Sequence, residues 1–218
     1  NYNRHEEEEE EDLEEKEDKK YEQDVREVVK EETFEKKEIK VEQFNDEKQQ
    51  KLIDQLNILN MIEHPNILKI EGFYFNKTEM TASFLYKQYQ TTLDQAVMGD
   101  SISNVDAVCS IYQLAEAFKY AHFVGVFHGY LTPENIILDP KGIIKVGGFG
   151  CSILRKFDAN KFTSPEIVKD LNFDEKADVY SFAIIILFVL SGGELPKSKN
   201  VGKKPSVPDY FNDYSKDF

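Results

Sequence analysis

Cysteine is scarce in this sequence. Only Cys109 and Cys151 occur, and their spacing fits neither a metal site nor a disulfide framework. The four histidines are scattered, without the cysteine or carboxylate pattern that a zinc site requires. The N-terminal residues show no signal-peptide pattern. We therefore expect reduced thiols, no zinc site and a cytoplasmic location.

Glycine is absent from the first 71 residues, and the first one in the chain is Gly72. A glycine-rich loop that binds phosphate needs glycines so that its backbone N–H groups can approach the phosphate oxygens. The first third of the sequence therefore predicts no such loop.

Long apolar runs are missing as well. The most apolar stretch, residues 182–190, is nine residues long, whereas a membrane-spanning helix needs about 20. We predict a core helix, hydrophobic on all sides, that ends at Ser191-Gly192-Gly193. We expect no membrane span. Nucleic acid is not an expected ligand either, because no basic stripe with interleaved aromatic residues is present.

Negative charge is concentrated at the N-terminus. Residues 1–32 hold sixteen acidic and six basic side chains, a net charge of −10 out of −14 for the whole chain. Such a segment repels itself and buries little, so we predict an acidic arm over residues 1–32 that is disordered or forms a solvated helix over about residues 13–29. Two interpretations remain open: a solubilising tail, or an arm that contacts a basic partner protein.

Two segments carry the strongest functional signal. Residues 128–135 have the sequence His-Gly-Tyr-Leu-Thr-Pro-Glu-Asn, and Gly148-Phe149-Gly150 begins twenty residues after the histidine. Three further segments occur in the same chain: His64-Pro65-Asn66-Ile67-Leu68, Ser164-Pro165-Glu166 and Asp178-Val179-Tyr180-Ser181-Phe182. In their order, these five segments resemble the H-R-D-L-K-P-E-N, D-F-G, H-P-N-I, A-P-E and D-V-W-S-F motifs of the protein kinase superfamily, over roughly residues 33–195.

The resemblance implies an α+β, bilobal protein-kinase-like fold. It places a reduced, β-rich N-lobe at residues 33–89 and a truncated, mainly helical C-lobe at residues 90–218. The hydrophobic periodicity agrees with this layout, since it predicts a helix over residues 46–62 and a strand over residues 81–86. The short apolar run over residues 67–75 would supply the strand before that hairpin.

A longer helix is predicted to begin after Ser103 and Asn104. Its buried face is expected to consist of apolar residues, namely Val105, Val108, Ile111, Tyr112, Ala115, Phe118 and Tyr120. His122, at the end of this helix, is interpreted as a surface or packing residue.

Compared with the kinase motifs, this chain is degenerate at most positions that carry the chemistry. Phosphoryl transfer needs bound nucleotide, metal and lysine to neutralise its phosphates, and a carboxylate that accepts the substrate proton. Tyr130 replaces that catalytic aspartate, and a phenol, with a pKa of about 10, is a poor base at neutral pH. Gly129 replaces the neighbouring arginine and Thr132 the lysine. Gly148 replaces the metal-binding aspartate and offers Mg²⁺ no side-chain oxygen, so Asn135 is the residual metal-ligand candidate.

The N-lobe positions are also altered. Lys40 lies where the family places its phosphate-binding lysine, and Gln55 lies where the family has the glutamate that pairs with it. A glutamine can accept a hydrogen bond from a lysine but cannot neutralise it. Glu38 would occupy the small apolar position that faces adenine. The alternative is a solvated, lysine-rich strand edge that also includes Lys36 and Lys37.

The positions that hold the family fold together are better preserved. The resemblance places Leu59, Ile70, His128 and Phe149 in an apolar stack that Asp178 anchors. We therefore interpret His128 as a packed structural residue rather than a catalyst, and its motif supplies no carboxylate to orient it.

Later family helices are expected to be mostly absent, so that Glu166 would lack the buried arginine that a complete kinase supplies. The segment between Phe149 and Pro165 is short for a segment on which substrate peptides dock. It carries three hydroxyls that are either phosphorylation sites or simply solvated: Ser152, Thr163 and Ser164.

The predicted function is a catalytically inactive kinase-like domain that acts as a protein-interaction or regulatory module without a cofactor. Its partner would be a protein, such as an active kinase or a basic protein that contacts the acidic arm. Two alternatives remain open. One is a weak kinase or ATP-binding domain that uses ATP and Mg²⁺ through Lys40 and Asn135, and the other is a truncated, non-functional remnant.

Overall fold

The computed structural model describes residues 16, 19–20, 34–41, 46–61, 63–76, 78–89, 91–139, 141–154, 160–169 and 174–195. The prediction for the acidic arm falls almost entirely outside these residues, and the arm remains a prediction. The described chain forms two compact units. The first contains residues up to 63, then 68–89 and 153–156, and the second contains residues 64–67, 90–152 and those from 157 onward.

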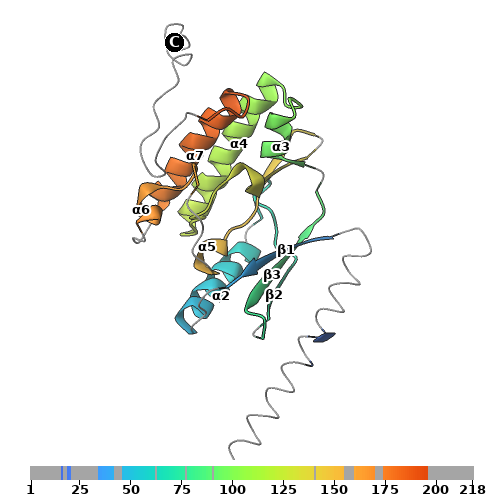
Figure 1. The fold of residues 1–218 in the computed structure, drawn as a ribbon, viewed down its shortest axis with the longest axis vertical. Coiled ribbons are helices and arrows are strands. Elements are labelled where there is room, and N and C mark those ends of the chain that lie inside the picture. The colour runs from blue at the N-terminus through green and yellow to red at the C-terminus, as the bar shows by residue number, and fades with distance from the viewer. Residues whose placement is uncertain are drawn as a thin grey trace, which may run out of the picture. The chain divides into compact units, whose positions relative to one another are not determined.

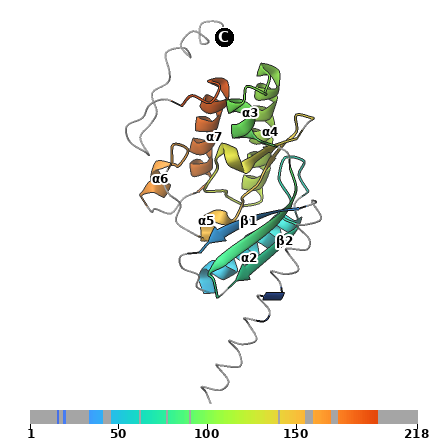
Figure 2. The same ribbon diagram turned by 45° about the vertical axis from the view of Figure 1, so that its right-hand side comes forward.

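The first unit is an antiparallel sheet with one helix. Its elements are β1 (Phe34–Lys40), α2 (Asp46–Met61), β2 (Gly72–Asn76) and β3 (Thr81–Lys87), and the strand order is β1-β3-β2. Figure 2 shows α2 running along one face of this sheet. The buried apolar side chains come from all parts of the unit: Ile39, Val41, Leu52, Leu59, Ala82, Phe84 and Tyr86.

The predicted helix over residues 46–62 and the predicted strand over residues 81–86 are both present. The apolar run over residues 67–75 is different, because only Gly72–Asn76 is a strand. Ile67 instead forms an isolated parallel bridge with Val146 in the second unit. A single apolar run therefore serves two different units, which periodicity does not reveal.

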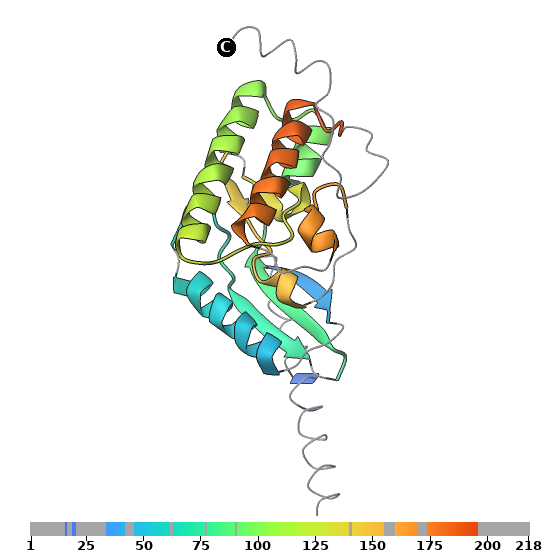
Figure 3. The same cartoon turned by 90° about the vertical axis from the view of Figure 1, so that its left-hand side faces the viewer.

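The second unit contains a small sheet and the long helices. Its sheet has the order β4-β5-β6, formed by β4 (Thr91–Thr92), β5 (Ile136–Leu138) and β6 (Ile144–Val146). The helical elements follow the chain order: α3 (Leu93–Met98), α4 (Asn104–Phe123), the 3₁₀ turn η1 (Pro133–Asn135), α5 (Cys151–Leu154), α6 (Pro165–Val168) and α7 (Glu175–Leu190). Helices α4 and α7 lie side by side (Figures 1 and 3).

Both long helices begin at a capping side chain. Ser103 Oγ accepts the backbone N–H of Asp106 at 3.1 Å, and an Asp174 carboxylate oxygen accepts that of Lys176 at 2.9 Å. These bonds satisfy N–H groups that have no partner inside the helix. Helix α7 ends where predicted, and Gly193 follows with a φ of 93°, a left-handed conformation that favours glycine.

The predicted buried face of α4 is wrong. The buried residues are mostly small: Ala107, Ser110, Leu114, Ala117, Phe118 and Ala121. Val105 and Tyr112 are 71% and 67% exposed. Small side chains allow a neighbouring helix such as α7 to approach closely, so size rather than hydrophobicity selected this face.

Helix α7 is buried on one side, not on all sides as predicted. Ile184, Ile185, Phe188 and Val189 are buried, whereas Val179, Ala183 and Leu190 are exposed. No helix in the described part of the chain is long and apolar enough to cross a membrane.

Residues 64–67 are tied into the second unit by polar contacts as well as by the Ile67 bridge. The Asn66 side-chain amide donates to Ile144 O at 2.9 Å and to Gln113 Oε1 at 2.8 Å. Lys145 Nζ donates to Pro65 O at 2.8 Å. The His-Pro-Asn-Ile segment therefore belongs to the small sheet of the second unit.

Candidate functional site

The loop that matches the catalytic motif, residues 128–135, is held by one buried carboxylate. Asp178 is 1% exposed, and its two oxygens accept the backbone N–H groups of His128 and Gly129, each at 2.8 Å. Hydrogen bonds to an ionised acceptor are stronger than neutral ones. The start of α7 thus fixes the entry to the loop.

His128 is fully buried. Its Nδ1 accepts the backbone N–H of Tyr130 at 3.2 Å, so Nε2 carries the proton and donates to Gly147 O at 2.9 Å. The ring centroid lies 4.8 Å from that of Phe149. A backbone carbonyl, rather than a carboxylate, therefore orients this histidine, and both ring nitrogens are occupied by structural bonds.

Sequence reasoning missed the role of His122. Its Nε2 lies 2.9 Å from Asp178 Oδ2, and its ring packs edge-on against Phe118 and Phe127. The contact joins the end of α4 to α7, across 56 residues of sequence. No local pattern signals a contact of that separation.

Tyr130 occupies the place of the catalytic base and is half-buried. Its hydroxyl oxygen accepts a hydrogen bond from Asn160 Nδ2 at 3.3 Å, and its backbone carbonyl accepts one from Asn135 Nδ2 at 3.1 Å. The neighbouring Thr132 is buried, and its hydroxyl oxygen accepts a second bond from Asn135 Nδ2 at 3.3 Å. The amide of Asn135 therefore binds the loop to itself.

Gly148 packs against this same amide. The glycine has a φ of 85°, and a Cβ built at this position would lie 3.1 Å from Asn135 Oδ1 and 3.3 Å from its Cγ. Contacts this short force a neighbour to move. The backbone N–H of Gly147 also donates to Asn135 O at 2.8 Å. Asn135 and Gly148 thus form one packed unit.

These residues do not fit a bound Mg²⁺. That ion prefers octahedral oxygen coordination that includes carboxylates, whereas the loop offers the amide oxygen of Asn135 and a glycine. Across the described residues, no group of three or more His, Cys, Asp or Glu side chains could hold a metal ion.

The two predicted nucleotide-binding residues of the first unit are not joined by a hydrogen bond. Lys40 is exposed at the end of β1, opposite Thr81 of β3, and it has no ion pair in the described part of the chain. Gln55 is half-buried, and its Oε1 is buried without a hydrogen-bond partner among the described residues. Lys36 pairs with Glu38 at 2.7 Å. The strand thus presents charged side chains of both signs to solvent.

The four residues of the expected apolar stack are shared between the two units. Leu59, which is buried, and Ile70, which is half-buried, lie in the first unit. His128 and Phe149 lie in the second unit, where both are buried and in ring contact.

The Ser-Pro-Glu segment differs from expectation. Thr163 and Ser164 are buried, so neither hydroxyl is presented to solvent or to a modifying enzyme, and Ser152 is half-buried. Glu166 is half-buried and has no ion pair in the described part of the chain. Burial raises the pKa of the Tyr180 phenol, and the negative charge of Glu166 adds to that effect.

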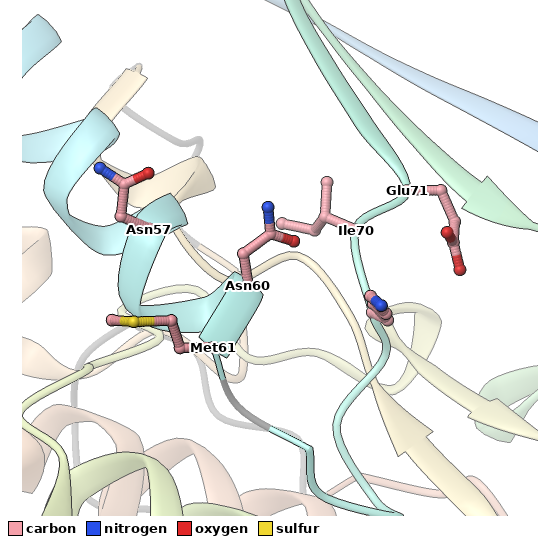
Figure 4. A pocket seen from close by; sticks show the side chains of 6 residues that line it. Asn57, Asn60, Met61, Ile70 and Glu71 are labelled. Atoms are coloured by element: carbon pink, nitrogen blue, oxygen red, sulfur yellow. The ribbon is translucent and has the colours of Figure 1, made fainter.

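The first unit has a hollow of about 550 Å³ at the end of α2, a volume in the range of small-ligand sites. Figure 4 shows Ile70 directed toward Asn60 of α2 and Glu71 directed away. The lining residues are mostly polar: Asn57, Asn60, Met61, Lys69, Ile70 and Glu71.

Comparisons with known proteins identify the family. The protein kinase domain model matches residues 23–208. CBL-interacting protein kinase 9 of Oryza sativa subsp. japonica is 30% identical over 205 residues, which cover 83% of this chain and 45% of that protein. CBL-interacting serine/threonine-protein kinase 9 of Arabidopsis thaliana is 30% identical over 162 residues, covering 67% of this chain and 36% of that protein.

The chain therefore belongs to the protein kinase family, and its predicted α+β kinase fold is confirmed. It spans less than half the length of these two relatives.

Proposed function

We propose that this chain is a catalytically inactive member of the protein kinase family that acts as a protein-interaction or regulatory module. The geometry around Gly148 carries the proposal. Phosphoryl transfer needs a carboxylate there to hold Mg²⁺, yet a Cβ at this position would lie 3.1 Å from Asn135 Oδ1. Any side chain would displace the amide that holds Tyr130 and Thr132. The loop is organised around the absence of a carboxylate.

The second missing carboxylate supports the same function. A general base must be able to accept a proton from the bound substrate. The hydroxyl of Tyr130 instead accepts a hydrogen bond from Asn160 of this same chain. With Gly148 and Tyr130 in these places, we propose that neither ATP nor Mg²⁺ is a functional cofactor.

The satisfied polar groups around Asp178 favour a folded module over a non-functional remnant. A buried carboxylate without partners destabilises a protein strongly, and here two backbone N–H groups and His122 surround it. We expect such a network to support cooperative unfolding.

We propose the C-terminal end of α2 as a contact face for the partner protein. Met61 is exposed there, beside the exposed amides of Asn57 and Asn60, which can both donate and accept hydrogen bonds. Interfaces combine an apolar centre with a polar rim. The net charge of −14 steers association toward a basic partner. Partner identity and the cytoplasmic location stay predictions.

A thermal-shift titration with ATP, with and without Mg²⁺, tests the function. A ligand that binds only the folded state stabilises it by about 2.7 kcal/mol when its concentration is 100 times Kd. We expect one cooperative transition without a shift at millimolar nucleotide. The kinase domain of the rice relative, titrated in parallel, is the positive control.

The other outcomes separate the alternatives. A Mg²⁺-dependent shift would contradict the proposal and support a surviving nucleotide site at Lys40 and Asn135. A broad transition with aggregation would support a remnant.

A further inference from the structure

We infer that Tyr130 is a positioning residue that ties the turn of residues 160–164 to the loop of residues 128–135, and so closes the substrate side of the site from within. The inference rests on the proposed function, because position 130 is where the family places the base that meets the substrate hydroxyl. It adds a regulatory role to a residue that otherwise marks only a loss. We call residues 160–164 the Asn160 turn.

The backbone of Tyr130 is fixed from both sides. Its N–H donates to His128 Nδ1 at 3.2 Å, and its carbonyl accepts from Asn135 Nδ2 at 3.1 Å. The first partner, His128, is itself fully buried. The phenol therefore extends from a rigid base, and its hydroxyl oxygen accepts the 3.3 Å hydrogen bond from Asn160 Nδ2.

The Asn160 turn is closed on itself by the same side chain. Asn160 Oδ1 accepts the backbone N–H of Phe162 at 2.8 Å and the hydroxyl of Thr163 at 3.1 Å. The Thr163 hydroxyl oxygen accepts the N–H of Asn160 at 3.0 Å. With both functions of its amide in use, Asn160 joins the interior of the turn to Tyr130.

The far side of the turn is attached to α7. Phe162 is buried, its ring packs edge-on against Phe188 at a centroid distance of 5.9 Å, and its carbonyl accepts the Ser181 hydroxyl at 2.7 Å. The Asn160 turn is therefore anchored at one end by α7 and at the other by Tyr130. Phe162 and Ser181 make the permanent attachment, and the single hydroxyl of Tyr130 makes the separable one.

The consequence concerns access. A substrate hydroxyl that approached position 130 would have to replace Asn160 as the partner of the phenolic oxygen. Opening the turn would break one neutral hydrogen bond, which changes a local opening equilibrium by roughly two- to tenfold. Tyr130 therefore keeps the turn closed without making it immovable.

Hydrogen exchange measured by mass spectrometry on the full chain tests this inference with the variant Tyr130→Phe. The variant removes only the hydroxyl. We expect the amides of Phe162 and Thr163 to exchange about two- to tenfold faster, with the amides of α4 and α7 unchanged. Tyr112→Phe, which removes an exposed hydroxyl on α4, is the matched control and should leave exchange in the Asn160 turn unchanged.

Each result decides the matter. Unchanged exchange in Tyr130→Phe would overturn the inference, because the hydroxyl would then hold nothing. Faster exchange throughout the chain would also overturn it, since Tyr130 would be a general packing residue.

A third variant, Asn160→Asp, keeps the acceptor oxygen inside the turn and lets the Tyr130 hydroxyl donate to a carboxylate. It should retain protection of the turn, and loss of protection would count against the bond. These readouts do not depend on nucleotide. A Mg²⁺-dependent ATP shift in the unmodified chain would therefore defeat the proposed function and leave the exchange result standing.

Discussion

Replacing Gly148 with alanine probes the space that a metal-binding aspartate would need. The position has a φ of 85°, and a residue with a Cβ pays about 1–2 kcal/mol in that left-handed region. The new Cβ would also lie 3.1 Å from Asn135 Oδ1. If the amide moves, it weakens its bonds to Tyr130 and Thr132, at about 1 kcal/mol each. We expect Gly148→Ala to lower the free energy of unfolding by about 3 kcal/mol in total.

Gly125 offers a control for the backbone part of this effect. It has a φ of 79°, and a Cβ there would meet no atom within 4 Å. Gly125→Ala should therefore cost only the conformational term, about 1–2 kcal/mol. Urea unfolding of both variants, with the slope of the transition checked for constancy, gives the difference. If Gly148→Ala is no more destabilising than Gly125→Ala, the argument that Asn135 excludes a side chain at position 148 is refuted.

Three further predictions address the packing around the loop. Asp178→Asn should lower the free energy of unfolding by about 2–4 kcal/mol, because one backbone N–H then faces an amide nitrogen; a loss below 1 kcal/mol in urea would contradict the anchor role. Phe162→Ala should cost about 3–5 kcal/mol while Phe123→Ala, at an 86% exposed position, changes stability by under about 0.5 kcal/mol; equal melting temperatures would refute the burial argument. Burial lowers the pKa of His64, whose Nδ1 accepts the N–H of Asn66, so its stabilisation is complete above the unfolded pKa of about 6.5 and is lost as pH falls through the folded pKa; His64→Gln should flatten the urea midpoints between pH 5 and 7, and an unchanged profile would contradict this.

Motif order was the most informative part of the sequence. The five segments predicted the kinase fold, because positions such as Asp178 and Phe149 keep side chains that the fold requires. Local signals also sufficed for the bounds of α2 and for the end of α7 at the glycines. These features depend on residues close together in sequence, so a pattern can reveal them.

The features that the sequence did not reveal depend on partners far away in the chain. The buried face of α4 was selected by neighbours that need small side chains, so Val105 and Tyr112 lie outside it despite their hydrophobicity. His122 contacts a carboxylate 56 residues away, and Tyr130 meets Asn160 30 residues away. Which polar groups pair at such separations depends on how the helices pack, and packing is a property of the folded chain.

The placement of residues 64–67 limits how this protein can be divided. The first unit is made of three stretches of chain, and the second unit takes its residues 64–67 from between two of them. A fragment that begins at residue 90 would lose the amide of Asn66 from Ile144 O, the carbonyl of Pro65 from Lys145 and the backbone bridge at Ile67. No single cut yields either unit whole. Expression of the helical part alone would need those four residues reconnected, for example by a circular permutation or as a peptide supplied in trans.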